Sequence, residues 1–265
     1  MKLNTLCLLI ILAVCCGNLS FSQRTKEVRK TVDLNANGRV SIKTYKGSIT
    51  IDTWEKPRVE IVATVEPDGH HRDDEELVRE TEIRIDESPD EVRIESDYDR
   101  LEHHRRHSFW GFFVGENITL PFVHYTITMP RTARVAIDDY KSESHITDLH
   151  APLKLETYKG TVSVDGLAGS IDLETYKGEV TVTLAKLDSD SRLKTEKGKF
   201  DINFAPEAGC TIDLDIGRRA DYHSDFDTAR LNRRHGEDRM TTTINGGGPS
   251  LRIETKKGEI RLRKK

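Results

Sequence analysis

The residue types best suited to chemistry in this chain are tyrosine–lysine pairs that recur at a fixed spacing. Three pairs lie 18 residues apart, and Lys197 continues the lysine series after them: Tyr140-Lys141, Tyr158-Lys159 and Tyr176-Lys177. If the repeats stack as parallel strands, equivalent side chains lie about 4.8 Å apart. The tyrosines then form a ladder, with a column of lysine ammonium groups beside it. Aromatic faces can stack on sugar rings and lysines attract anions, so the pattern predicts a surface for an anionic or sugar-rich polymer.

A purely structural role for the same residues stays open. Stacked rings on neighbouring strands stabilise a sheet by up to about 1 kcal/mol per pair. The lysine column repels itself, and we expect Glu156, Glu174 and Glu179 to relieve that repulsion. The spacing alone does not separate a ligand-binding surface from a ladder that only stabilises strands.

Histidines form a second candidate cluster: His70, His71, His103, His104 and His107. On a helix, His103 or His104 together with His107 would present two imidazoles on one face, where Zn²⁺ or Cu²⁺ binds. No cysteine accompanies them, and the charges of Arg105 and Arg106 oppose a cation. We interpret these histidines as solvated surface residues and predict no cofactor, with metal binding left open.

The candidate catalytic acids are Asp138 and Asp139, because parallel β-helices host polysaccharide lyases and hydrolases. Successive strand residues point to opposite faces, so this pair does not act together on one surface. The sequence has no nucleophile–base motif, phosphate loop or metal triad. We therefore predict that the protein is not an enzyme. A carbohydrate-cleaving β-helix enzyme is the alternative.

Two nearly identical stretches position the tyrosine–lysine pairs, Leu155–Val164 and Leu173–Val182. Apolar and polar residues alternate in each, which predicts half-buried strands. An isolated pair of such strands is marginal in water, but stacking one period on the next buries the apolar face. The sequence therefore predicts an all-β fold, a single-stranded, β-helix-like β-solenoid of stacked ~18–20-residue coils.

A glycine ends each tyrosine–lysine segment and its variants, and these glycines are predicted structural turn residues: Gly47, Gly160, Gly178, Gly198 and Gly258. We expect the first four at the third position of a type II turn, where glycine adopts a positive φ without a Cβ clash. The threonine three residues before each of those four should face inward.

The remaining segments break this period. Lys26–Asp33 and Arg39–Thr44 flank a turn signal and predict an N-terminal hairpin that caps the solenoid. Residues 66–115 are a non-repetitive α/β excursion, with a short helix over Asp73–Thr81 and a hairpin over 82–96. Further along the chain the repeat decays before one last unit.

Residues 1–22 are typical of a secretory signal peptide, which leaves 23–265 as a single β-solenoid domain. Lys2 precedes an apolar run too short to span a bilayer, so the mature chain has no transmembrane segment. A lipid anchor at Cys15 or Cys16 is less favoured, because the residues before them are not the small ones expected. We predict export to the periplasm or the cell surface.

Composition narrows the class of partner. The chain has 41 basic and 45 acidic residues, a net charge of −4, with both signs interspersed. Nucleic-acid binding needs a basic excess, so we predict no nucleic-acid partner.

Removal of residues 1–22 leaves Cys210 as the single cysteine, which excludes an intramolecular disulfide. Its alternating apolar surroundings indicate a packed, inert thiol.

Three features carry a family resemblance: the strand Tyr125–Pro130, the serial strand–Gly–strand units, and the closing segment Ile244–Ile260. Their order resembles the bacterial “putative adhesin” family, domain of unknown function 4097, over about Val28–Arg263. The resemblance implies an exported single-chain β-solenoid and brings no catalytic residues. This chain departs from it by carrying Lys or Glu where many units could carry Asn or Asp at the turn.

These observations together predict an exported, non-enzymatic cell-envelope protein, an adhesin or a binding or scaffold module. Its partner is an envelope polymer or protein that the sequence does not identify. A further alternative is an envelope-stress sensor or partner subunit that uses the hydrophobic patch Phe109–Phe113.

Overall fold

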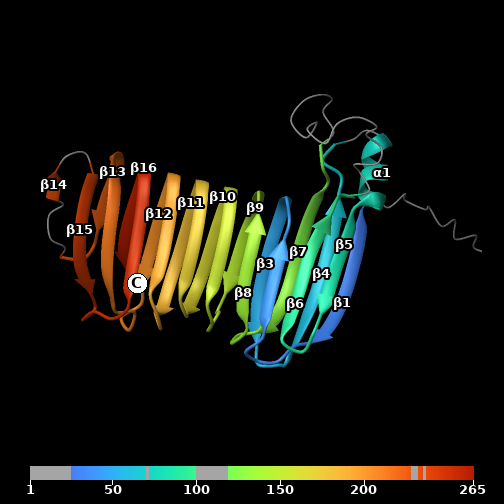
Figure 1. Cartoon of the computed structure of the whole chain (residues 1–265), viewed down its shortest axis with the longest axis horizontal. Coiled ribbons are helices and arrows are strands. Elements are labelled where there is room, and N and C mark those ends of the chain that lie inside the picture. The colour runs from blue at the N-terminus through green and yellow to red at the C-terminus, as the bar shows by residue number, and fades with distance from the viewer. Residues whose placement is uncertain (1–24, 70–71, 100–118, 228–231, 235–236) are drawn as a thin grey trace, which may run out of the picture.

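The described residues form a 16-stranded sheet whose strands lie side by side along the long axis of the molecule (Figure 1). The structure is a computed structural model that describes residues 25–69, 72–99, 119–227, 232–234 and 237–265. Its elements are β1 (Lys26–Asp33), β2 (Arg39–Lys43), β3 (Lys46–Trp54), β4 (Arg58–Glu66), α1 (Arg72–Glu80), β5 (Glu82–Glu87), β6 (Glu91–Asp97), β7 (Phe122–Pro130), β8 (Arg134–Asp139), β9 (Lys141–Thr147), β10 (Leu153–Ala168), β11 (Ile171–Lys186), β12 (Ser191–Phe204), β13 (Cys210–Ser224), β14 (Asn232–Arg234), β15 (Glu237–Ile244) and β16 (Ser250–Lys264).

The repeats form long strands that pair in parallel and in register. β10 pairs with β11, β11 with β12, and β12 with β16, so that Leu155, Leu173, Leu193 and Ile253 fall in one row. Each added strand covers the apolar face and the backbone groups of the one before it. The predicted β-solenoid is confirmed.

Each long strand bends at its tyrosine–lysine segment, or at the equivalent place in β12, β13 and β16, and contributes to two walls. Before the bend, β10 pairs with β8, which pairs with β2 and through it with β6. After the bend, β10 pairs with β9, and β3, β7, β4 and β1 follow. Thr157 is the last buried residue before the bend and Val162 the first after it. This odd spacing shifts the alternation by one position, which lets both segments face inward.

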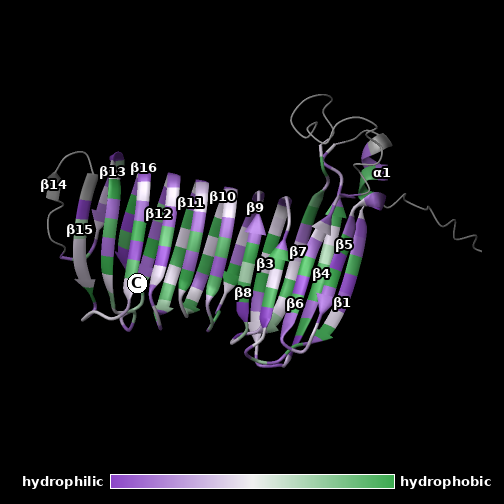
Figure 2. Cartoon of the chain, viewed as in Figure 1, coloured by the Kyte–Doolittle hydropathy of each residue, from purple (hydrophilic) through white to green (hydrophobic). Residues whose placement is uncertain are grey.

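Alternating apolar residues from both walls fill the interior. One buried column contains Ile137, Leu155, Leu173, Leu193 and Ile253, and another contains Ile146, Val164, Val182, Ile202 and Leu262. Figure 2 shows the alternation as green and purple bands along the strands. Full burial of such a side chain stabilises a fold by roughly 1.5–3 kcal/mol, so these columns are the main source of stability.

The glycines at the bend are required for a different reason from the predicted one. Gly47 has a φ of 138°, but Gly160, Gly178 and Gly198 lie inside continuous strands and do not have a positive φ, so the predicted type II turns are wrong there. A Cβ on Gly178 would lie 2.0 Å from the carbonyl oxygen of Gly160. Neighbouring backbones approach too closely at this point for any side chain.

The predicted N-terminal hairpin is wrong. β1 pairs antiparallel with β4 at the end of the sheet, and β2 lies in parallel between β6 and β8 in the other wall. Val40 and Ile42 of β2 are buried in register with Val135 and Ile137 of β8. They extend the buried columns of the solenoid, which explains why β2 joins the stack instead of pairing with β1.

The helix and hairpin predicted within residues 66–115 are present, as α1 and as the antiparallel pair β5–β6. This region is nevertheless not separate from the solenoid. β6 also pairs in parallel with β2, which makes it the next strand of the first wall. Residues 100–115 lie outside the described residues.

The last repeat takes an unexpected place in the stack. β16 lies between β12 and β13, although β13 precedes it in the chain. Beyond β13, the strands β15 and β14 are antiparallel. The described sheet therefore has antiparallel strands at both ends, which breaks the pattern that another parallel coil would need in order to add to it.

We expect Gly178→Ala to destabilise the fold by about 1–3 kcal/mol, the usual cost of forcing extra atoms into a filled position. Urea unfolding followed by circular dichroism measures the change. Thr161→Ala, at an exposed position on the neighbouring strand, is the control and should change stability by less than about 0.5 kcal/mol. Equal effects of the two substitutions would contradict a role for the close approach of the strands.

Candidate functional site

Four tyrosine rings stack in a row along the bend. Their centroids lie 4.8 Å apart for Tyr45 and Tyr140, and 4.9 Å apart for Tyr140 and Tyr158 and for Tyr158 and Tyr176. The ring planes are parallel within 9°. The structure therefore brings the three predicted tyrosines of the repeat together. Tyr45, which was not among them, adds a fourth stacked ring. The signal was the segment Tyr45-Lys46-Gly47, which matches the repeat far upstream of it.

This stacking decides which part of each ring meets solvent. Tyr140 and Tyr158 each have a ring neighbour on both sides, so their faces are covered. They are nevertheless 40% and 44% exposed, through their edges and hydroxyl ends. The sequence led us to expect that sugar rings stack on the tyrosine faces. For Tyr140 and Tyr158 this does not fit the geometry, because other tyrosine rings already cover both faces. The ladder presents a row of phenol hydroxyl groups instead.

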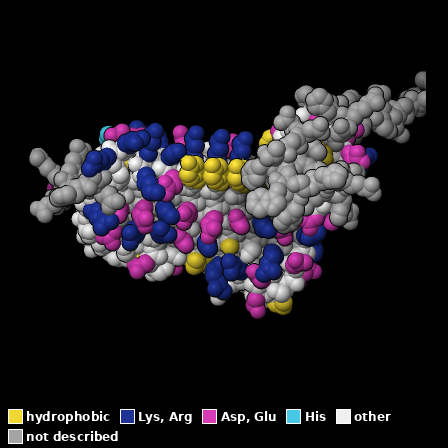
Figure 3. Space-filling view, turned by 45° about the horizontal axis from the view of Figure 1, so that its top comes forward, with side chains coloured by type: hydrophobic (Ala, Val, Ile, Leu, Met, Phe, Trp, Pro, Cys, Tyr) yellow, Lys and Arg dark blue, Asp and Glu magenta, His cyan; other side chains and the backbone are white. Residues whose placement is uncertain are grey.

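A column of cations runs beside the hydroxyl row, one residue further along each strand. Its members are Lys141, Lys159, Lys177, Lys197, Lys257 and Arg219, in register and exposed. Figure 3 shows the tyrosines in yellow, with dark-blue cationic side chains above them and magenta acidic side chains below. Lys257 and Arg219 extend the predicted column. Lys46, which is in register with Lys141, is instead buried and forms an ion pair with Asp68 at 2.7 Å.

Two of the three acids expected to neutralise this column pair elsewhere. Glu174 accepts a hydrogen bond from Lys194 at 2.6 Å, and Glu156 pairs with Lys154 at 2.8 Å. These lysines belong to the first wall. In the part of the chain that the structure describes, no member of the cation column forms an ion pair with a carboxylate. The column therefore keeps its positive charge at the surface.

The tyrosine ladder ends where the sequence of the repeat changes. Glu196 follows Tyr176 in the row and pairs with Lys256 at 2.7 Å. Lys197 Nζ donates a hydrogen bond to the Tyr176 hydroxyl at 3.1 Å and lies 5.2 Å from the ring centroid. The hydrogen bond to Tyr176 raises the pKa of Lys197, so the ammonium is fully charged at neutral pH. Lys197 thus closes the ladder at this end.

A polar column lies on the inner side of the bend. The four threonines that were predicted to face inward are buried: Thr44, Thr157, Thr175 and Thr195. Thr255 is also buried and extends this column. Asp139 occupies the equivalent place in the coil before Thr157 and accepts hydrogen bonds at Oδ1 from Thr157 Oγ1, at 2.9 Å, and from the Ser142 backbone N–H, at 3.1 Å. Its Oδ2 atom has no hydrogen-bond partner among the described residues.

Burial raises the pKa of Asp139 to about 6, because the charged carboxylate loses its hydration. The hydrogen bonds from Thr157 and Ser142 oppose this shift. Asp138 is exposed on the outer face while Asp139 is buried, so the two acids point away from each other as expected. They do not form a shared catalytic pair.

Of the other candidate residues, the structure describes Cys210 but not the histidine cluster or the Phe109–Phe113 patch. Cys210 is a buried free cysteine, and burial raises the pKa of its thiol to about 12, which makes it an inert packed residue. All five histidines of the candidate metal cluster and the Phe109–Phe113 patch lie outside the described residues. Within the described ranges, no group of three or more His, Cys, Asp or Glu is placed to hold a metal ion. No described helix is long and apolar enough to cross a membrane.

Comparison with known proteins finds one family. The sequence profile described as Toastrack DUF4097 matches residues 131–263, just over half of the chain. This segment contains β8 to β15 and most of β16, and with them three of the four stacked tyrosines. A comparison with curated protein sequences finds no match.

A solved structure shares the fold. A protein titled “putative cell adhesion protein” from Clostridium sporogenes is 12% identical, with a TM-score of 0.54, and the match covers 91% of this chain and 100% of that one. A “putative adhesin” from Bacteroides fragilis is 10% identical, with a TM-score of 0.37, over 91% and 97% of the two chains. At these identities the likeness concerns the fold alone.

The buried carboxylate at Asp139 predicts a pH effect on stability. Its pKa is about 6 in the folded protein against an ordinary value of 3.8. The stability that the protonated carboxyl contributes to the fold is therefore fully present below pH 3.8 and is lost as pH rises through 6. We expect Asp139→Asn, which keeps the acceptor oxygen, to raise the unfolding free energy at pH 7 by about 2–3 kcal/mol and to have no such effect near pH 3.

Urea unfolding across this pH range measures the effect, with the exposed Asp138→Asn as the matched control. If Asp139→Asn showed the same pH dependence of stability as Asp138→Asn and the original protein, burial of the Asp139 carboxylate would not affect the stability.

Proposed function

This chain belongs to the Toastrack DUF4097 family, and we propose that it is an exported, non-enzymatic binding module of the cell envelope. Its ligand in this proposal is an anionic envelope polymer held along the bend of the solenoid. The observation that carries the proposal is the cation column beside the row of tyrosine hydroxyls, which repeats once per coil.

The geometry favours a polymer that lies along the solenoid axis. Successive ammonium groups stand on strands about 4.8 Å apart, so each rung offers a cation and a neighbouring hydroxyl to the next anionic group of a regular chain. An anion close to the column also relieves the repulsion between its members. The net charge of −4 disfavours a polyanion at long range, but at physiological salt charges are screened beyond about 8 Å, so the local column dominates.

The flat, repeating form of this surface supports binding over catalysis. Most glycoside hydrolases use two acids that converge on one bond. Asp138 and Asp139 point to opposite sides of their strand. The Clostridium sporogenes structure, which shares the fold, is titled “putative cell adhesion protein”, and this agrees with a binding role for this chain.

Export is the second part of the proposal, and it rests on the apolar run after Lys2 and the small residues Ser20 and Ser22. Intact-mass spectrometry of the protein isolated from its native cells should find an N-terminus near Gln23, in the envelope or secreted fraction. A chain that retains Met1 in the cytoplasmic fraction would refute export while leaving the binding surface to be tested by itself.

The binding surface is tested by two triple variants and one control. The variants are Lys141→Gln/Lys159→Gln/Lys177→Gln and Tyr140→Phe/Tyr158→Phe/Tyr176→Phe, and the control is Lys43→Gln/Lys186→Gln/Lys264→Gln, which removes the same charge from exposed lysines elsewhere. Phenylalanine keeps the stack and removes only the hydroxyls. We expect each variant to weaken binding to purified anionic envelope polymer by about tenfold or more, and the control to change it little.

Co-sedimentation at two salt concentrations measures the binding, and thermal unfolding confirms that each variant is folded. Addition of salt should weaken the original protein more than the lysine variant, because ionic screening acts on charges that the variant lacks. Unchanged binding by both folded variants would reduce the ladder to a structural role.

A further inference from the structure

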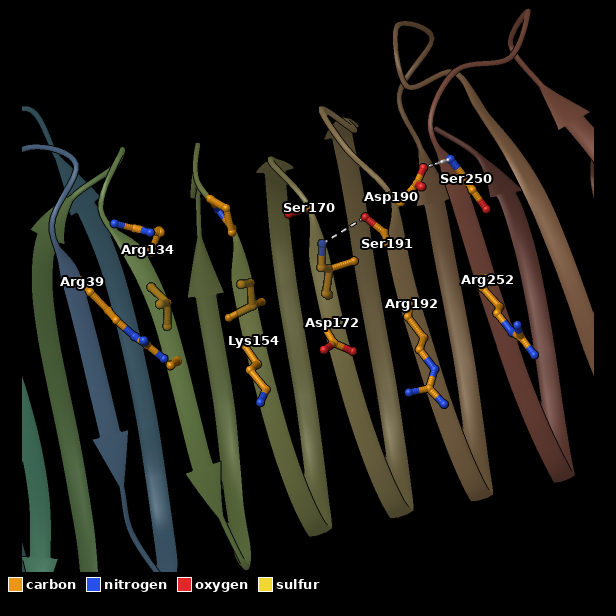
Figure 4. Close-up of a pocket in the computed structure, with 15 residues that line it drawn as sticks. Arg39, Arg134, Lys154, Ser170, Asp172, Asp190, Ser191, Arg192, Ser250 and Arg252 are labelled. Carbon is orange, nitrogen blue, oxygen red and sulfur yellow. Dashed lines mark hydrogen bonds between the residues drawn. The ribbon is translucent and has the colours of Figure 1, made fainter.

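A groove on the first wall carries a second concentration of cations, away from the bend. It has a volume of about 540 Å³ and crosses the first residues of β2, β8, β10, β11, β12 and β16. Five cationic side chains line it, Arg39, Arg134, Lys154, Arg192 and Arg252, against the two acids Asp172 and Asp190. Figure 4 shows Lys154, Asp172, Arg192 and Arg252 in a row across successive strands, with Arg39 and Arg134 at one end.

Arg39 and Arg134 form the end of this groove that is open to a ligand. They stand opposite each other in register on β2 and β8, and both are exposed. Like charges in directly opposed positions destabilise a sheet unless something neutralises them. Neither arginine forms an ion pair with any carboxylate in the part of the chain that the structure describes. Two arginines on adjacent strands, neither of them ion-paired, have donor forks available to an anion.

Four of the other five lining charges are already engaged, and Asp172 is the exception. Arg192 and Arg252 share Glu254, with Nε–Oε1 distances of 3.1 and 2.8 Å. Asp190 accepts a hydrogen bond from the Ser250 backbone N–H at 2.9 Å. Lys154 pairs with Glu156 at 2.8 Å across exposed surface, where an ion pair is weak and readily exchanged. The available charge of the groove therefore lies at its Arg39–Arg134 end, with Lys154 beside it.

The shape at this end comes from a small residue. Ala136 stands between Ser41 and Lys154 in the outward row that continues through Asp172 and Arg192, and its methyl group leaves a hollow beside the long side chain of Lys154. Pro152, from the segment before β10, lines the same groove. The hollow thus combines an apolar floor with charged walls. That is the surface a sugar ring needs, since its C–H groups are apolar and its substituents are polar.

We propose that this groove is a binding site for a carboxylate-bearing glycan. The two oxygens of a uronate carboxylate match the planar donor fork of Arg39 or Arg134, which bind such groups in a bidentate manner. The sugar ring lies over Ala136, and Lys154 meets the next carboxylate along the chain. The acidic row Asp138, Glu156 and Glu174 separates this site from the cation column, so the two surfaces act independently.

The site is tested with a short oligogalacturonate as the probe and a neutral maltooligosaccharide as its uncharged counterpart. Isothermal titration calorimetry at low and at physiological salt measures the affinity of the full chain. We expect the original protein to bind the oligogalacturonate in a salt-dependent manner and not to bind the neutral sugar. Arg39→Gln/Arg134→Gln should weaken this binding by about tenfold or more.

Two further variants separate binding in the groove from binding at the bend. Ala136→Leu fills the hollow without changing any charge, and it should weaken binding to a similar degree. Lys141→Gln/Lys159→Gln removes the same charge from the bend and should leave intact the part of oligogalacturonate binding that depends on Arg39 and Arg134. Thermal unfolding verifies that every variant is folded.

The outcomes distinguish this inference from the proposed function. Loss of binding in the groove variants alone supports the groove, and loss in the bend variant alone overturns it while supporting the bend. Absence of binding to oligogalacturonate by the original protein overturns it as well. Tighter binding of inorganic polyphosphate than of oligogalacturonate, with the same dependence on Arg39 and Arg134, would overturn the assignment to a carboxylate-bearing glycan.

Discussion

The close approach of neighbouring backbones at the bend is the constraint on which the rest of this structure depends. A Cβ on Gly160, Gly178, Gly198 or Gly258 would lie within 2.3 Å of the carbonyl oxygen of the residue beside it on the adjacent strand. Glycine at each of these places lets the strands meet in register. Once the register is fixed, every side chain of one coil stands next to its counterpart in the following coil. Rows of like residues then follow necessarily on both sides of the sheet.

This repetition has opposite effects on different side chains. Tyrosines gain from it, because parallel rings at 4.9 Å make favourable contacts. The lysines in the next row make an unfavourable contribution to stability, because the register holds their like charges near one another. The outer surface therefore stores electrostatic repulsion on a scaffold made rigid by ring stacking and by a hydrophobic interior. A ligand of opposite charge gains affinity from relieving that repulsion, without a conformational change in the protein.

Much of the fold follows from local sequence signals. Identical segments 18 residues apart predict stacking, and the alternation of apolar residues predicts which side of each strand is buried. Local signals do not reveal partners that are distant in the chain. β2 carries only Val40 and Ile42 as inward residues, which fit several neighbours equally well, so a hairpin with β1 was as reasonable as the observed place beside β8. The turn prediction was wrong because it explained each glycine by its own torsion angle, whereas the adjacent strand excludes the side chain.

The candidate sites divide in the same way. Tyr140, Tyr158 and Tyr176 could be found from sequence because their spacing equals one coil. The covering of their faces could not, since it depends on ring orientation. Arg39 and Arg134 lie far apart in the chain, and although each stands six residues before a tyrosine of the ladder, their juxtaposition depends on β2 joining the first wall. No periodic pattern marks the groove that they form with Ala136.

The position of β16 between β12 and β13 also bears on how the chain folds during synthesis. In a chain made from its N-terminus, β10, β11 and β12 appear in order, and each has a partner strand that has already been made. β13 is made next and carries the same kind of inward residues, Ile212 and Leu214, yet the place beside β12 belongs to a strand made later. Native pairing there must wait for β16, and a premature β12–β13 pair would have to open first. The step that completes the stack is therefore a long-range one, set by the last strand to be synthesised among those described.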